Sequence, residues 1–589
     1  MENYWQRERD EMGFTLVTCK DDIAPYLPAL RQSKILAVDT ETTGLDPHID
    51  RIRLVQLATK GLPVFVVDCF SFLPEGLGML KDMLEGSNVK VFQNAKFDFQ
   101  FFMALDIYPT PIFDTMLAGQ LLRTSGGPHR ANLAALAKHY LDEEVAKDEQ
   151  TSDWQGDLNQ AQLSYAARDA EVLPRLREVM VEKLLENGLS EITRIEFACV
   201  HAIAQMEFTG IYLDTERWKQ LIVQTEKQRD EALDTLYTFS GKPMVQMSLL
   251  DDGVVMNPNF ESNQYILHLL HSNGIPVDTT SKRVLSAYAG HPLIKALAAY
   301  RKAVKALSSF LYPIPQMIHP VTGRLHPRYG QIGAWSGRMS CGGPNIQQIP
   351  RDASFRACFV APPGRKLVIA DYSQIELRVA AQISGDSRMI AAYKRGEDLH
   401  TLTAALVSDV PVDVVSKSQR QAAKAVNFGL IFGMGAAGLQ QYAQQSYGVE
   451  MTLEEATRFR DSFFRAYPGI ASWHRGIKNA RPTEERTITG RKFVFRENSE
   501  VSGLYNTPVQ GTAADIAKAA LGTLAQRVQG TTTKIVAAVH DEILLEADDH
   551  EAVLAAATLK DAMEQAGNQI LTDVPCVAEV KVSDTWAGK

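Results

Sequence analysis

Two acidic residues, Asp371 and Asp541, lie far apart in the sequence but in the same local setting. Each follows a short apolar run, residues 367–370 for the first and residues 535–539 for the second. Runs of this length predict buried strands, and a carboxylate at the end of a buried strand is costly unless it has a partner. If the two strand ends meet in space, the pair predicts a shared metal site.

A second acidic set lies in the first third of the chain. Asp39 and Glu41 follow an apolar run at residues 35–38, and the twofold period of a strand puts them on one face. Two further acids each lie four residues after a polar residue in helical sequence, so that each pair shares a helix face. These pairs are Asn94 with Asp98 and Tyr165 with Asp169. Four converging acids could hold two hard cations that activate a water on a phosphodiester, with Tyr165 orienting the water, although any single pair would also suit an ordinary surface.

Downstream of the first strand-end acid, four residues spaced by four form one stripe on a predicted helix. Its cations, Arg420 and Lys424, could clamp a triphosphate, and its rings, Phe428 and Phe432, could stack on a base. An amphipathic helix whose cations merely extend to solvent is the open alternative. The GxGxxG pattern at residues 433–438 follows this helix rather than a strand, which argues against a dinucleotide loop and predicts a turn.

The elements that must position these residues predict a mixed α/β protein. A chain of 589 residues is too long for one core and predicts several domains. Strand patterns fall at residues 33–70, 487–495, 534–547 and 576–582, and helical patterns fall at residues 75–185, 190–240, 285–311, 388–465 and 511–528, with a break at Pro411. A boundary between two modules is expected near residues 185–200.

The charge distribution predicts a polyanionic ligand. The net charge is −9, yet residues 279–351 contain no Asp or Glu and ten Lys or Arg. Such an acid-free basic stretch is typical of a surface that binds nucleic acid or another polyphosphate. A solvated helix face is the alternative, although such faces usually mix both signs.

The sequence predicts a cytoplasmic protein. No apolar run approaches the ~18 residues of a membrane span, and the six cysteines contain no CxxC pair, as expected for reduced thiols. The first twelve residues carry four acids, unlike a signal or transit peptide. A bacterial cell, a phage-infected cell and an organelle all stay open as settings.

The N-terminal acids resemble those of one nuclease family. The motifs, intact and in order, are Asp39-x-Glu41 within DTETTGLDP, Asn94-x-x-x-Asp98 and Tyr165-x-x-x-Asp169. Over residues 30–180 the chain is similar to the DEDD 3′→5′ exonuclease superfamily, in its tyrosine-containing branch. The resemblance implies an active nuclease with an RNase H-like fold.

Residues 195–589 resemble the polymerase portion of A-family DNA polymerases, the bacterial polymerase I type. Six motifs in family order carry the resemblance: SGRMS at 336–340, PNIQ at 344–347, DYSQIELR at 371–378, the helix at 420–433, QGTAAD at 510–515 and VHDE at 539–542. The implied fold is α/β multidomain, with an RNase H-like exonuclease domain and a right-hand polymerase. The implied domains are 1–190 exonuclease, 191–335 thumb and start of the palm, 336–387 palm, 388–470 fingers, and 471–589 the C-terminal part of the palm.

The resemblance implies a template-directed DNA polymerase with 3′→5′ proofreading, acting in DNA replication or repair. Asp371 and Asp541, helped by the Tyr372 carbonyl, would hold two Mg²⁺ ions, with Mn²⁺ as an alternative, and Glu542 would be a further catalytic residue. Lys424 would protonate pyrophosphate as it leaves. Two further ions would be held by Asp39, Glu41, Asp98 and Asp169, with Tyr165 as the catalytic neighbour.

The resemblance also implies which residues touch the substrates. The nucleotide-binding residues would be Arg420, Lys424, Phe428, Phe432, Glu376, Gln374, His400 and Tyr372. Glu376 would occupy the place of a ribose 2′-hydroxyl and so exclude ribonucleotides. The DNA-binding residues would be Arg338, Asn345, Gln347, Asn506, Gln510, His540 and Lys305. Several of these would follow the minor groove, whose acceptor pattern is nearly independent of sequence, while Arg378 is expected to be structural.

Three departures from the family pattern carry expectations. Phe432 stands where the family usually has Tyr, so a hydroxyl near the template base is missing and the details of fidelity are in doubt. Phe428 is the bacterial-type residue, which predicts discrimination against dideoxynucleotides. About 30 residues precede the exonuclease strand, so the 5′ nuclease domain of full-length bacterial enzymes is expected to be absent.

Primer-template DNA and deoxynucleoside triphosphates are the expected partners of a monomeric enzyme, with replisome proteins as a further option and no membrane. Two other functions stay open. A stand-alone nuclease with a DNA-holding module would need broken palm acids, whereas Asp371 and Asp541 are both present. A non-catalytic scaffold is disfavoured because both acid sets are complete.

Overall fold

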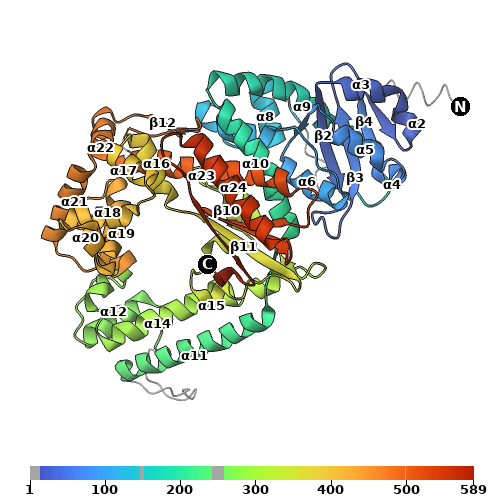
Figure 1. The fold of residues 1–589 in the computed structure, drawn as a ribbon. Coiled ribbons are helices and arrows are strands. Elements are labelled where there is room, and N and C mark those ends of the chain that lie inside the picture. The colour runs from blue at the N-terminus through green and yellow to red at the C-terminus, as the bar shows by residue number, and fades with distance from the viewer. Residues whose placement is uncertain (1–12, 146–151, 242–257, 498, 589) are drawn as a thin grey trace, which may run out of the picture.

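The computed structural model describes residues 13–145, 152–241, 258–497 and 499–588 of the chain. The acidic N-terminal segment discussed above, residues 1–12, lies outside them. The described part is mixed α/β, as predicted, and forms several bodies (Figure 1). Within these ranges no helix is long and apolar enough to cross a bilayer.

A six-stranded mixed sheet forms the N-terminal body, coloured blue in Figure 1. In spatial order its strands are β1 (Phe14–Val17), β4 (Val64–Asp68), β3 (Ile52–Ala58), β2 (Ile35–Thr42), β5 (Val89–Phe92) and β6 (Ile112–Asp114). Every residue of β3 and β4 is buried, which confirms strands in the predicted 33–70 region. The mostly helical pattern expected for 75–185 is wrong at β5 and β6, because such short apolar runs carry no readable period.

One helix, α10 (Ser190–Thr209), connects the N-terminal body to the rest of the molecule and packs against both. It contacts α6 (Ala95–Ala104) of the first body and α23 (Val501–Val528) of the second. Its buried carboxylate Glu207 accepts hydrogen bonds from Lys96 Nζ at 2.8 Å and from the backbone N–H of Tyr329 at 2.6 Å. The connection near residues 185–200 is therefore a helix that is packed on both bodies.

A four-stranded antiparallel sheet forms the centre of the C-terminal part. Its strands in spatial order are β14 (Lys534–Val539), β15 (Glu542–Asp548), β11 (Arg365–Tyr372) and β16 (Ala578–Ser583). The helix α24 (Ala552–Ile570) packs on β11 and β16 and against α23. The predicted strands at 534–547 and 576–582 are confirmed. The helix expected at 511–528 begins earlier, at Val501. The sequence did not indicate this start because proline usually ends a helix, whereas Pro508 lies buried inside this one.

Two helical bodies complete the C-terminal part, one at the left of Figure 1 in yellow and orange and one at the bottom in green. The first consists of α17 (Ser387–Lys394), α18 (Leu399–Ser408), α19 (Lys417–Ile431), α20 (Ala436–Tyr447), α21 (Leu453–Ala466) and α22 (Pro468–Ala480). The second consists of α11 (Thr215–Ser240), α12 (Asn263–Ser272) and α14 (Pro292–Ala306) and has its own apolar cluster. Gly433 has φ +80° between α19 and α20, so the GxGxxG stretch begins with the predicted turn.

Two candidate active sites

The predicted acids of the N-terminal body come from three elements that meet at β2. Asp39 and Glu41 lie two residues apart on β2 and therefore share a face. Asp98 comes from α6, and Asp169 comes from α9 (Gln160–Glu186), which packs across β2. The structure thus brings together all four acids that the sequence predicted for this site, which we call the carboxylate cluster.

Hydrogen bonds orient one member of the carboxylate cluster. Thr40 Oγ1 donates to Asp98 Oδ1 at 2.6 Å. The sequence predicted that Asn94 lies within the helix. In the structure it occupies the N-cap position just before α6, where its backbone is left-handed with φ +66°. The buried Asp114 accepts from Ala95 N at 2.8 Å and holds this helix start in place. Its place at the end of the apolar run 112–113 is the signal that would have found it.

Burial is the main cause that raises the pKa of each acid in the carboxylate cluster. It raises the pKa of Glu41 to about 8, that of Asp98 to about 7 and that of Asp169 to about 6. The pKa of Asp39 lies well above its usual range because of burial and then the charges of Asp169, Asp98 and Glu41. Carboxylates that repel one another in this way are short of positive charge.

The carboxylate cluster fits divalent cations by its chemistry. Carboxylate oxygens are the ligands that hard cations prefer, and Asp169 Oδ1 is buried without a hydrogen-bond partner among the described residues. Within the described ranges no three His, Cys, Asp or Glu side chains are already arranged as a metal-ligand group. Tyr165 forms a hydrogen bond with Asp169, which places its hydroxyl at the edge of the cluster.

Strand pairing brings the two palm acids together. β11 pairs with β15 in a register that sets Asp371 opposite Glu542. The residues between β14 and β15 are only His540, with φ +61°, and Asp541. The backbone N–H of Tyr372 donates to the carbonyl of Asp541 at 3.3 Å. The two strand ends that the sequence predicted therefore meet at one edge of the sheet.

Glu542 lies next to the palm acids but is more fully bonded to its neighbours. It is buried, accepts from Arg356 Nη1 at 3.2 Å and from Trp586 Nε1 at 2.5 Å, and lies with both in a cavity of about 410 Å³. A carboxylate with these two donors is fixed in the packing of the sheet. The catalytic role expected of Glu542 stays a prediction, and in the structure its carboxylate is held by these two donors beside Asp371 and Asp541.

A cavity of about 730 Å³ lies in front of the palm acids, and we call it the palm cavity. The predicted residues that line it are Arg338, Asp371, Tyr372, Gln374, Glu376, His400, Arg420, Lys424, Phe428, His540 and Asp541. Arg351, Tyr442 and Tyr447 also line it and were not predicted for the site. Arg351 ends the acid-free stretch of the sequence, which is the signal that marks it.

Arg420 already has a carboxylate partner in the palm cavity. Its Nε donates to Asp398 Oδ2 at 2.6 Å, and Gln374 Nε2 donates to Asp398 Oδ1 at 3.2 Å. Burial alone would raise the pKa of Asp398, but hydrogen bonds from Arg420 and Thr401 hold it well below its usual range. Arg420 was expected to bind a triphosphate. In the structure its side chain is positioned by Asp398, an acid that sequence reasoning missed.

His400 lines the palm cavity as a neutral donor. Burial is the main cause that lowers its pKa to about 4, where the charge of Asp398 opposes the shift and those of Lys424 and Arg420 add to it. Asn427 Nδ2 donates to His400 Nδ1 at 2.9 Å. The ring proton therefore lies on Nε2, and the ring lies 5.8 Å from that of Phe428, centroid to centroid.

Three residues of the 371–378 motif have side-chain partners within the protein. Glu376 forms an ion pair with Arg338 across the palm cavity. The Tyr372 side chain is buried and donates to Met563 O at 2.7 Å, so only its backbone can face a nucleotide. Arg378 is buried against Ser373 O and the Tyr393 ring, in a structural position as expected.

The other predicted contact residues do not belong to the lining of the palm cavity. Phe432 caps α19 and packs on the core, Asn506 and Gln510 lie one turn apart on α23, and Lys305 is exposed on α14. Gln347 Nε2 donates to Ala538 O at 3.5 Å, and Asn345 lies two residues before it. Of the predicted DNA contacts, only Arg338 and His540 belong to the described lining of the cavity, and these six residues lie outside that lining.

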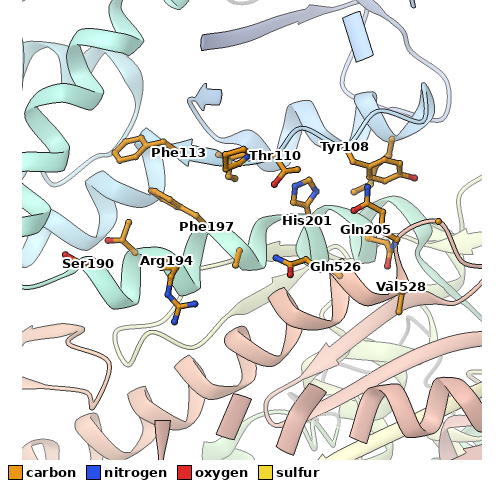
Figure 2. Close-up of a pocket in the computed structure, with 18 of the residues that line it drawn as sticks. Tyr108, Thr110, Phe113, Ser190, Arg194, Phe197, His201, Gln205, Gln526 and Val528 are labelled. Carbon is orange, nitrogen blue, oxygen red and sulfur yellow. The ribbon is translucent and has the colours of Figure 1, made fainter. Parts of the chain in front are cut away.

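A third hollow, the α10 groove, lies away from both acid sites. It has a volume of about 610 Å³ and is lined by residues of β6, α9, α10 and the end of α23. Figure 2 shows Phe113, Phe197, His201 and Arg194 along it, with Gln526 across from them. Its lining contains none of the predicted site residues.

Two family models match the chain in tandem. The model described as 3′-5′ exonuclease matches residues 14–185, and the model described as DNA polymerase family A matches residues 255–588. The first range holds the carboxylate cluster, and the second holds both palm acids.

Known DNA polymerases I are similar to nearly the whole chain. That of Aquifex aeolicus (strain VF5) is 32% identical over 601 residues, which cover 98% of this chain and 100% of the relative. That of Chloroflexus aurantiacus is 31% identical, covering 97% of this chain and 63% of the relative. A solved structure, described as the POL domain of Pol1 from M. smegmatis in complex with DNA primer-template and dNTP, matches 96% of this chain and 98% of its own, with a TM-score of 0.80 at 25% identity. The chain therefore belongs to DNA polymerase family A and carries a 3′-5′ exonuclease domain in front of its polymerase domain.

Proposed function

We propose that the palm cavity extends primer 3′ ends along a DNA template and that the carboxylate cluster removes nucleotides from the same ends. The observation that supports this most is the register of β11 and β15, which sets Asp371 opposite Glu542 and so next to the turn that carries Asp541. Arg420 and Lys424 line the same cavity. Acids that can hold cations, together with cations that can hold phosphates, suit a triphosphate substrate.

Divalent cations complete both sites in this proposal, with Mg²⁺ preferred and Mn²⁺ as a substitute. They would be held by Asp371, Asp541 and the Tyr372 carbonyl in the palm cavity and by Asp39, Glu41, Asp98 and Asp169 in the carboxylate cluster. When bound, they would lower the pKa of the attacking oxygen and neutralise charge on the leaving oxygen. These ligands are all hard oxygens, which fits this class of cation.

The side chains of the palm cavity have separate tasks in the proposed reaction. Arg420 leaves Asp398 for a phosphate oxygen, and His400 donates its Nε2–H to the same triphosphate. Lys424 supplies a proton to pyrophosphate as it leaves. Phe428 lies beside the sugar and base, and Glu376 blocks a 2′-hydroxyl.

The DNA contacts and the nuclease follow the same reasoning. Arg338 and His540 reach the minor groove at the primer end from the palm cavity, where acceptors are nearly sequence-independent. The residues proposed to continue along the duplex are Asn345, Gln347, Asn506, Gln510 and Lys305. In the carboxylate cluster, Tyr165 orients the attacking water.

The ligand classes and the setting are proposed from the relatives. The M. smegmatis structure contains primer-template DNA and dNTP, and we expect the same classes here. We expect a monomer in the cytoplasm of a bacterial or phage-infected cell, with replisome proteins as further partners. The proposed domains divide at residues 190, 335, 387 and 470, as in the resemblance.

One primer-extension gel tests the proposal. It compares wild type, Asp371→Ala and Asp39→Ala on a labelled primer-template with and without dNTPs. Extension should be lost only in Asp371→Ala, and primer degradation should be lost only in Asp39→Ala. Persistent extension by Asp371→Ala would refute the assignment of the palm acids, and persistent degradation by Asp39→Ala would refute that of the cluster.

A further inference from the structure

Four charged side chains form a buried network beneath the palm cavity. Glu196 comes from α10, Arg491 from the loop before β13 (Lys492–Val494), and Asp515 and Lys518 from α23. Each is between 0 and 4% exposed. Lys518 Nζ donates to Glu196 Oε1 at 2.6 Å, and Arg491 Nη2 donates to Asp515 Oδ1 at 2.7 Å. Arg491 also pairs with Glu196, so two acids and two bases close one neutral network.

Packing alone does not require such a network. Removing four charges from water carries a large desolvation cost, and well-packed apolar residues often replace a buried ion pair without loss of stability. The two bases hold Glu196 ionised, since they lower its pKa although burial alone would raise it. A network of this kind is therefore of interest for what it holds in place.

The network holds both ends of the loop at residues 331–338. At the first end, Gln331 Nε2 donates to Glu196 Oε2 at 2.6 Å. At the second end, Lys518 Nζ donates to Gly337 O at 2.8 Å. The Arg491 guanidinium lies directly against Gly337, where an added Cβ would lie 2.6 Å from Arg491 Nε, and φ is +82°. The backbone is thus held from two sides one residue before Arg338.

Arg338 carries the effect of the loop into the palm cavity. Its guanidinium forms an ion pair with Glu376, the acid proposed to exclude ribonucleotides. Gly337 has no side chain and is fixed by both bases, so a shift of the network moves the backbone that carries Arg338. Small displacements at a reacting centre have large kinetic effects, because about 1 Å can change a rate about 100-fold.

We infer that Glu196, Arg491, Asp515 and Lys518 are positioning residues of the polymerase: they hold the 331–338 loop so that Arg338 meets Glu376, and thereby set sugar selectivity. The inference rests on the proposed function of the palm cavity. It assigns these residues no contact with substrate, and their task is to act through Gly337 and Arg338.

The test uses two variants that disturb the loop in different ways. The double variant Glu196→Gln/Lys518→Gln removes one acid and one base, so the remaining pair, Arg491 with Asp515, stays balanced. Gly337→Ala leaves all four charges and instead pushes a methyl group against Arg491. Single-nucleotide incorporation of dATP and ATP opposite template T is measured in an Asp39→Ala background, which removes degradation of the primer.

Both variants should lower kcat/KM for dATP by about 10- to 100-fold and should reduce the ratio of dATP to ATP incorporation by about tenfold. Exonuclease activity on single-stranded DNA, measured without Asp39→Ala, should stay at the wild-type level and reports folding. Two controls should keep the wild-type ratio. Arg194→Gln lies on the same helix but faces the α10 groove (Figure 2), and Arg324→Gln breaks a buried ion pair whose acid, Glu546, keeps Arg365.

An unchanged dATP to ATP ratio in the folded variants would overturn the inference, even if the overall rate falls, because a merely structural network lowers rate without altering sugar choice. If the double variant also loses exonuclease activity, it is misfolded and the ratio of Gly337→Ala decides. Failure of the proposed function is a separate result: wild type itself would then not extend the primer.

Discussion

The carboxylate cluster and the palm cavity balance their negative charge in different ways. In the cluster, burial raises the pKa of Asp39, Glu41, Asp98 and Asp169, and repulsion by the other carboxylates adds to the shift of Asp39 and Glu41. In the palm cavity, the acids line the same cavity as four positively charged side chains, namely Arg338, Arg351, Arg420 and Lys424. A site that cuts a phosphodiester needs only bound metal cations. A site that uses a nucleoside triphosphate must also balance the negative charge of that substrate. The protein supplies that second set of charges itself.

The largest expected effect separates the two sites outright. Asp541→Asn keeps the shape of the turn between β14 and β15 but removes one negative charge from the palm acids. Primer extension should fall at least about a thousandfold, because charge stabilisation at a metal site contributes several kcal/mol. Degradation of single-stranded DNA by the same protein should not change. Single-turnover rates of both reactions measure this, and extension within tenfold of wild type would break the contrast.

A smaller effect is expected from the residue that orients the water. Tyr165→Phe removes the hydroxyl that bonds to Asp169 but leaves all four acids. Exonuclease turnover should fall about 10- to 100-fold, in line with the loss of a positioning contact, while extension stays constant. Thr40→Val, which removes the hydrogen bond to Asp98, is the matched variant on β2 and should show a milder loss. Equal loss in both reactions would instead indicate a defect of folding.

The contrast in charge balance predicts different responses to pH. Burial raises the pKa of Glu41 to about 8 and that of Asp169 to about 6, so protons compete with cations for these oxygens as pH falls through that range. Exonuclease activity should fall at least about tenfold between pH 8.5 and 6, and extension should fall less. More Mg²⁺ at pH 6 should restore the nuclease. Parallel pH profiles that do not respond to Mg²⁺ would remove the basis of the comparison.

The smallest expected effect is on stability. Acids whose pKa is raised in the folded state bind extra protons there, so the free energy of unfolding falls as pH rises from about 4 towards 8 without cations. Mg²⁺ at about 100 times its Kd should restore about 2.7 kcal/mol and raise the first Tm by about 5–11 °C, at about 2–4 °C per kcal/mol for a unit of about 150–250 residues. Differential scanning fluorimetry at pH 8 with EDTA or Mg²⁺ measures the shift. Asp39→Asn/Asp169→Asn should stabilise the EDTA form and lose most of the shift.

The sequence predicted the acids of both sites because each acid sits in a local pattern. Asp371 and Asp541 end apolar runs, and the strands there are confirmed by β11 and β14. The side chains that balance them belong to no such pattern. Asp398 reaches Arg420 across 22 residues, and Arg356 reaches Glu542 across 186. Partner choice over such separations depends on packing that no local period records.

The missed elements have the same physical origin. β5 and β6 are four and three residues long, too short for alternation to be distinguished from a helix. The early start of α23 was not predicted because Pro508 suggested a helix end. In the structure Pro508 is buried within the helix, as are its neighbours in the chain. Glu196 and Lys518 lie 322 residues apart, and an isolated acid in helical sequence is usually exposed. Buried charge networks are thus the part of this fold that sequence reasoning recovers least.

The double packing of α10 limits how this enzyme can be divided into parts. A polymerase fragment that begins at residue 190 would keep Glu207 but lose Lys96 and Gln100, two side chains that donate to it. A buried carboxylate that loses its donors destabilises whatever remains around it. Such a fragment needs a neutral residue at position 207, for which Glu207→Gln keeps the acceptor for Tyr329 N. The exonuclease and polymerase bodies are therefore not independent modules, because side chains of one body complete the buried hydrogen bonds of the other.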